Sequence, residues 1–136
     1  MPDYSNPYPE LIPNGLWKPL VLILPTATIP GVSGDMFISD GHYIVREARS
    51  SHTVASSSGT VQIEVLTPGQ NADDGVDQLT TTMSLSGTAD TPVKATIITS
   101  PTVINPGDRV GYVLGGTLTS LINGCITVFL ERLRRG

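Results

Sequence analysis

The chain has 136 residues and a net charge of −4, a length that suits one domain. Val, Ile and Thr, which favour strands, number 39, whereas Ala, Glu and Lys, which favour helices, number 12. This composition argues against a helical bundle and against an alternating α/β fold, and the acidic balance is unlike that of a nucleic-acid-binding protein.

Residues 1–16 are rich in proline, with Pro2, Pro7, Pro9 and Pro13. Each proline removes a backbone donor and biases the preceding residue towards an extended conformation, so no helix or central strand can run through the segment. Between the prolines lie Tyr4, Tyr8, Leu11 and Ile12. We therefore expect an extended arm that binds a partner through these four side chains. Its own domain, a sibling subunit or another protein could supply that surface, and the alternative is a frayed terminus.

The same segment does not have the pattern of a secretory signal, because residues 1–15 contain Asp3 and Glu10 but no Lys or Arg. The longest apolar run, Leu20 to Leu24, is much shorter than the roughly 20 residues of a membrane-spanning helix. We expect a protein that is made in a cytoplasm, is soluble there and has no membrane partner.

Residues 17–24 predict a strand that is either buried on both faces or shared between subunits, because its residues are apolar on both faces. Pro19 suits the beginning or the edge of a sheet strand. We assign a subunit interface to four side chains of this strand: Trp17, Leu20, Leu22 and Leu24.

Further strands follow from alternating apolar residues and from turn signals between them. They are expected within 35–41, from Tyr43 to Ala55 with a bulge near Ser50-Ser51, and over 60–67, 79–85, 93–99, 110–115 and 125–131. Asn105-Pro-Gly-Asp108 has the chemistry of a tight turn. The count of eight or nine strands predicts one all-β domain over residues 17–136, an antiparallel sandwich or barrel.

Few residues suggest chemistry, and we predict no catalytic residues, no metal and no cofactor. His42 and His52 lack further zinc ligands at suitable spacing, and a Ser-His pair at His52 lacks an acidic partner close by in the sequence. Calcium is an alternative at the acidic loop that holds Asn71, Asp73, Asp74 and Asp77. That loop lacks the ligand ladder of an EF-hand, so a solvated loop is the preferred interpretation.

Three other features have ordinary structural interpretations. Cys125 is expected to be a small buried hydrophobe. Aromatic residues such as Tyr43, Tyr112 and Trp17 could stack on a sugar, but core or interface packing is preferred. The basic cluster at the C-terminal end is expected to be a solvated tail, with a salt bridge to an acidic partner as the alternative; it consists of Arg132, Arg134 and Arg135.

From Tyr43 onwards the chain resembles a small β-sandwich domain of tailed-bacteriophage structural proteins. The resembling stretches are Val45-Arg-Glu-Ala-Arg-Ser-Ser-His-Thr-Val54, Thr60-Val-Gln-Ile-Glu-Val-Leu-Thr67, Leu85-Ser-Gly-Thr-Ala89, Ile104-Asn-Pro-Gly-Asp-Arg-Val110, Gly116-Thr-Leu-Thr-Ser-Leu121 and Ile126-Thr-Val-Phe-Leu130. They are spread over residues 43–136, which make up about two-thirds of the chain. The Gly-Asp-Arg-Val turn is also similar to the turn of trimeric jelly-roll heads. The Pro-rich residues 1–20 lie outside the resemblance.

The resemblance implies a jelly-roll-like sandwich and a structural protein of the virion, without catalytic residues. The expected role is a capsid decoration (cement) protein that is trimeric, binds the major capsid protein on the capsid surface and stabilises the assembled shell. The alternative is the head module of a fibre or spike that binds a receptor or a glycan.

Overall fold

The computed structural model describes residues 17–24 and 33–133, and the arm at residues 1–16 lies outside the described residues together with its Tyr4, Tyr8, Leu11 and Ile12. Nine strands are present: β1 (Trp17–Leu24), β2 (Ser33–Ile38), β3 (Tyr43–Ser51), β4 (Thr60–Leu66), β5 (Val76–Asp77), β6 (Met83–Ser84), β7 (Val93–Lys94), β8 (Arg109–Gly115) and β9 (Gly124–Arg132). The described residues contain no helix, and therefore no helix that could span a membrane. The predicted all-β class and the strand count are confirmed.

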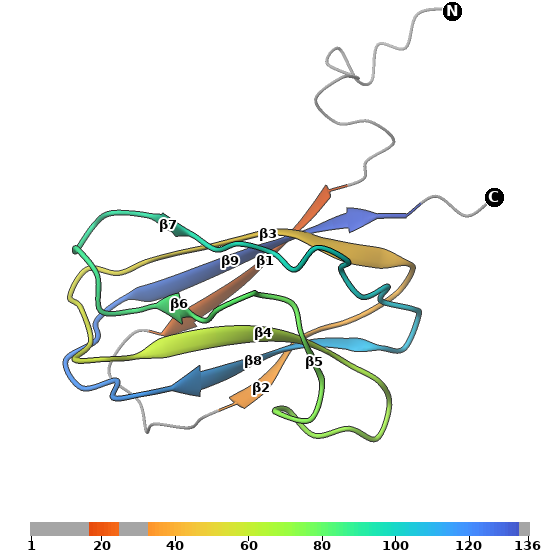
Figure 1. The fold of residues 1–136 in the computed structure, drawn as a ribbon, viewed down its shortest axis with the longest axis horizontal. Coiled ribbons are helices and arrows are strands. Elements are labelled where there is room, and N and C mark those ends of the chain that lie inside the picture. The colour runs from red at the N-terminus through yellow and green to blue at the C-terminus, as the bar shows by residue number, and fades with distance from the viewer. Residues whose placement is uncertain (1–16, 25–32, 134–136) are drawn as a thin grey trace, which may run out of the picture.

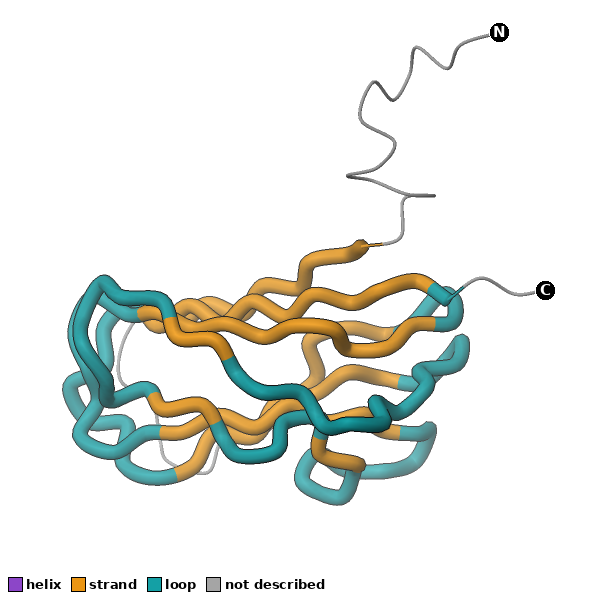
Figure 2. The backbone as a smooth tube through the Cα atoms, turned by 45° about the horizontal axis from the view of Figure 1, so that its top comes forward, coloured by secondary structure: helices purple, strands orange, loops and turns teal. Residues whose placement is uncertain are grey.

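The strands form two antiparallel sheets that pack face to face (Figure 1, Figure 2). Sheet A has the order β1-β9-β3-β7, and sheet B has the order β2-β8-β4-β5, with β6 pairing on β4. With β6 set aside, early and late strands interleave in both sheets. This interleaving is the arrangement of a jelly roll, in which two Greek keys wrap around one core.

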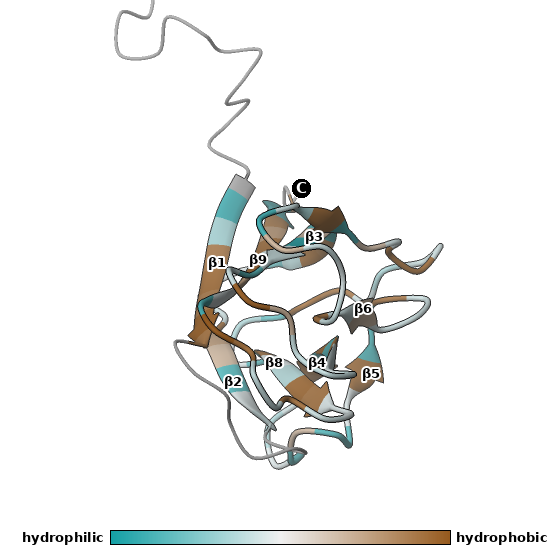
Figure 3. Cartoon of the chain, turned by 90° about the vertical axis from the view of Figure 1, so that its left-hand side faces the viewer, coloured by the Kyte–Doolittle hydropathy of each residue, from teal (hydrophilic) through white to brown (hydrophobic). Residues whose placement is uncertain are grey.

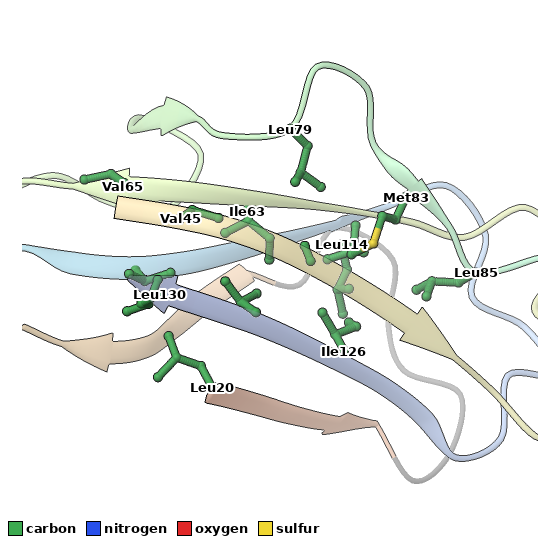
Figure 4. Packing of buried hydrophobic residues seen from close by; sticks show 14 of the residues in the cluster. Leu20, Val45, Ile63, Val65, Leu79, Met83, Leu85, Leu114, Ile126 and Leu130 are labelled. Atoms are coloured by element: carbon green, nitrogen blue, oxygen red, sulfur yellow. The ribbon is translucent and has the colours of Figure 1, made fainter. Parts of the chain in front are cut away.

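The core lies between the two sheets and draws on both of them (Figure 4). Sheet A contributes Val45 from β3 and Ile126 and Leu130 from β9, and sheet B contributes Ile63 from β4 and Leu114 from β8, all of them fully buried. In β9 the buried side chains recur at every second residue, as the pleat of a strand requires. The alternating apolar residues predicted for β4 and β9 therefore form part of the core between the two sheets.

Tyr43 belongs to this core, in agreement with the preferred interpretation of core packing over sugar stacking. Its ring is 2% exposed and meets Phe37 edge to face at 5.7 Å between centroids. The hydroxyl group donates a hydrogen bond of 2.7 Å to Asp40, which satisfies the one polar atom of the buried ring. Tyr112 is half-buried and packs against the same core.

The bulge in β3 lies at Arg46 and not near Ser50-Ser51, so that prediction was wrong. The register against β9 shifts between Val45 and Glu47, and the extra residue places Arg46 and Glu47 consecutively outside the core. Val45 and Ala48 both remain buried, although they are three residues apart. The physical reason is that a regular strand turns only every second side chain towards the core. The extra residue of the bulge allows Val45 and Ala48 both to face the core, while the charged Arg46 and Glu47 between them both face outwards.

The segments predicted as strands over 79–85 and 93–99 pair much less than expected. Regular pairing is limited to the two-residue strands β6 and β7, with one isolated bridge between Leu79 and Ile97. Leu79, Met83 and Leu85 are nevertheless buried. The alternating apolar residues of this region are therefore buried against the core without forming a long hydrogen-bonded ladder.

The turn at Asn105–Asp108 is confirmed and leads directly into β8. The amide of Asp108 donates to the carbonyl of Asn105 at 2.9 Å, and Gly107 has a φ of +89°. A positive φ at the third turn position is readily adopted only by glycine or asparagine. The carboxylate of Asp108 also accepts from the amide of Asn105 at 2.9 Å, which closes the turn on itself.

Candidate interaction surface

β1 is an edge strand whose two faces have different surroundings. It pairs with β9 along its whole length, and no described strand pairs with its other edge. Leu20 and Leu24 are buried and Leu22 packs against the core, whereas Val21 is 58% exposed and Ile23 is 56% exposed. The position of Pro19 on an edge strand agrees with the expectation drawn from its missing donor.

The burial of these side chains determines which residues of β1 can contact a partner. The leucines assigned to a subunit interface, Leu20, Leu22 and Leu24, point into the domain's own core. The side chain of Trp17 lies outside the described residues. A subunit interface at β1 stays a prediction, and the side chains available for it are Val21 and Ile23.

The exposed face continues from β1 onto β9. Val21 lies opposite Thr127 and Ile23 lies opposite Cys125 in the antiparallel register, while Phe129 lies opposite Pro19. We call the outward-facing residues Val21, Ile23, Cys125, Thr127 and Phe129 the β1–β9 strip. Figure 3 shows β1 changing from hydrophilic near its beginning to hydrophobic towards its end. Sequence reasoning missed this strip because every residue from 20 to 24 is apolar, so periodicity could not assign the faces.

A shallow hollow of about 260 Å³ adjoins the strip on the outer face of sheet A. It is open to solvent and is lined by Arg49, Ser50, Ser51, Pro92, Cys125, Thr127 and Phe129. Its volume lies just below the roughly 300–1,000 Å³ of small-molecule sites. Such a hollow can hold one ring or one short side chain of a partner.

Cys125 lines this hollow and is half-buried, so the prediction of a small buried hydrophobe was wrong. The physical reason is the pleat of β9, where Gly124, Ile126 and Val128 occupy the core face and Cys125 must point to the other side. The thiol lies 3.9 Å from the hydroxyl of Thr127 on the same face.

Charged side chains border the hollow on its β3 and β7 side. Arg49 and Lys94 both contact the carboxylate of Glu47, at 2.8 Å and 3.0 Å, and these two cations hold the pKa of Glu47 below its usual value. Arg46 pairs with Glu131 of β9. Three cations thus face two carboxylates on this surface, which leaves one positive charge in excess.

Both histidines make contacts within the fold. The imidazole of His42 contacts the side chain of Asn105 at 3.1 Å, and Nε2 of the buried His52 lies 2.8 Å from the carbonyl oxygen of Gly87. A carbonyl oxygen only accepts, so Nε2 of His52 carries the proton. Within residues 17–24 and 33–133 no group of three His, Cys, Asp or Glu side chains is placed to hold a metal ion.

The acidic loop is organised by the protein itself. The buried carboxylate of Glu64 accepts a hydrogen bond of 2.7 Å from the amide of Asp73. Burial, and then the nearby Asp77 and Asp73, raise the pKa of Glu64 above its usual value. Asp73, Asp74 and Asp77 are exposed, in agreement with the preferred interpretation of a solvated loop.

No protein-family model matches the chain, and the comparison with curated proteins finds no match either. Among solved structures, the chain is similar to a structure described as Bacillus endospore appendages that form a family of disulfide-linked pili. It is 13% identical to that chain, covers 88% of both chains and has a TM-score of 0.33. The chain is also similar to part of infectious bursal disease virus, strain Gx. There the identity is 14%, the match covers 84% of this chain and 32% of the viral chain, and the TM-score is 0.34. Likenesses of this degree carry no argument about function.

Proposed function

We propose that this protein is a structural component of a virion, a capsid decoration protein that binds the major capsid protein on the outside of an assembled shell. The observation that carries the proposal is the β1–β9 strip, with Val21 and Ile23 each more than half exposed on a strand whose other face fills the core. Contiguous exposed apolar surface is typical of protein–protein contacts. The jelly roll supports the proposal by analogy, because it recurs in viral capsid domains.

The work of such a protein is thermodynamic and requires no catalytic group. A protein that binds the assembled lattice, and not its separate subunits, stabilises the lattice by mass action. The arm at residues 1–16 binds a neighbouring chain of the assembly through Tyr4, Tyr8, Leu11 and Ile12, and Tyr is an effective interface anchor. In a homotrimer three subunits bind the shell together, so each added attachment benefits from a high effective concentration.

A second function is favoured by the hollow on sheet A. Phe129 lines it together with Ser51, Thr127 and Arg49. An aromatic ring with nearby hydrogen-bonding groups is a platform on which a sugar can stack. The alternative function is therefore a fibre or spike head that binds a receptor or a glycan.

Adding the purified protein back to particles that lack it tests the first function. We expect saturable binding of many copies over the shell and a higher temperature of shell disruption. The variant Tyr4→Ser/Tyr8→Ser should bind more weakly, and Asn6→Ala in the same arm should bind like the original chain. Binding of only a few copies at the tail would favour the fibre head, and no binding to any part of the particle would overturn both functions.

A further inference from the structure

We propose that the β1–β9 strip and its hollow form the receptor surface for residues 1–16 of a second copy of this chain. This inference rests on the proposed function, because both give the arm a role in assembly. It goes further by naming the surface that receives the arm and by committing to a sibling subunit as the chain that provides it.

The surface has an apolar floor next to an unfilled hollow. Ile23 and Cys125 are register partners, and Cys125 lines the hollow together with Pro92 and Phe129. Val21 and Ile23 extend this floor to the edge of the sheet, where no other described strand covers them. A segment lying across the outer faces of β1 and β9 would therefore remove apolar area from water and fill the hollow at the same time.

The arm matches this surface in both apolar and charged groups. It carries two tyrosines, Leu11, Ile12 and four prolines, and extended Pro-rich segments dock into grooves lined by aromatic residues with little loss of entropy. Its only charged side chains are Asp3 and Glu10. The outer face of sheet A has one cation in excess, and Arg49 at the rim of the hollow keeps half of its side chain exposed.

The direction of β1 favours a second copy over the chain's own arm. The arm joins the sandwich at Trp17, which lies opposite Glu131, and the hollow follows β9 away from that point, from Phe129 opposite Pro19 to Cys125 opposite Ile23. Trp17 and Ile23 are about 20 Å apart along β1, and sixteen extended residues reach roughly 50 Å. The chain's own arm would have to reverse direction before Trp17 to follow β1. An arm from a sibling can approach without a reversal.

Cys125 reports directly on this contact, because it is the only cysteine of the chain and lines the hollow. We would measure its rate of reaction with Ellman's reagent in the full chain over a series of protein concentrations. A docked arm shields the thiol. Because each chain brings one arm and one strip, roughly a quarter of the strips stay free at a total protein concentration of about ten times the dissociation constant, and the rate falls about fourfold. A synthetic peptide of residues 1–16 should give the same protection to dilute protein.

Matched variants separate the strip from the rest of the surface. Ile23→Thr should abolish the concentration-dependent protection, whereas Ile38→Thr should retain it, because Ile38 is an isoleucine on sheet B that is also more than half exposed. Tyr4→Ser/Tyr8→Ser should remove the protection from the side of the arm. Circular dichroism checks that each variant is folded, and Val21→Thr replaces Ile23→Thr if the latter is not.

Two outcomes would overturn the inference. Protection of Cys125 that is independent of concentration would show that each chain's own arm covers the strip, and equal reactivity at all concentrations with and without peptide would show that no arm binds there. In either case the add-back experiment still decides the proposed function. An arm that is required on the particle but never shields Cys125 would bind the capsid instead of a sibling.

Discussion

Glu64 is a buried carboxylate whose surroundings favour its protonated form. Burial is the main reason that its pKa is raised, and Asp77 and Asp73 add to the effect. The native state therefore binds a proton more tightly than the unfolded chain does. The free energy of unfolding rises as the pH falls through the raised pKa towards the ordinary value near 4.5, and the ionised group is unfavourable to the fold at neutral pH.

Glu64→Gln should stabilise the protein at neutral pH and remove this part of the pH dependence. The amide oxygen of glutamine can still accept from the amide of Asp73, as the carboxylate does at 2.7 Å, but it carries no charge into the buried site. Urea unfolding at pH 7 and near pH 5 measures both effects. A variant less stable than the original chain at pH 7 would contradict this account.

Glu47→Gln is the control, with the opposite sign. Arg49 and then Lys94 lower the pKa of Glu47, so its contribution is present above the ordinary pKa near 4.5 and disappears as the pH falls through the lowered one. The ion pairs are partly exposed and contribute at most about 1 kcal/mol. The variant should therefore be slightly less stable at pH 7 and equal to the original chain at strongly acidic pH.

Among the strands, β1 has one face that packs in the core and another that is exposed for contact. Leu20→Ala should lower the free energy of unfolding by about 2–3 kcal/mol, because it leaves a cavity in the core. Val21→Thr, one residue along, should change it by less than about 0.5 kcal/mol, because the side chain is 58% exposed. Urea denaturation of the two variants tests the assignment of the faces, and equal losses would contradict it.

The strands show which features could be predicted from the sequence. β4 and β9 alternate apolar and other residues, and the prediction located both closely. The position of the bulge at Arg46 could not be predicted, because it depends on the pairing of β3 with β9, two strands far apart in the sequence. The outward direction of Val21 and Ile23 was hidden for a related reason. A strand that is apolar on both faces leaves the choice to its tertiary neighbours.

At the scale of the whole molecule, the charges and the apolar surface are distributed unevenly. The strands of sheet A carry five basic residues and two acidic ones, whereas those of sheet B carry Arg109 and three acidic ones. Sheet A also holds the β1–β9 strip at an edge with no described neighbour. One layer of the sandwich is thus suited to contact, and the other presents the acidic loop near Glu64.

A cryo-electron microscopy map of the particle to which this protein belongs tests the proposed function most directly. We expect sandwiches in many copies on the outer surface of the shell, in groups of three, with residues 1–16 extended along a neighbouring chain. Density for the protein only at the tail or on a fibre, or an intact particle that contains none of it, would overturn the proposed function.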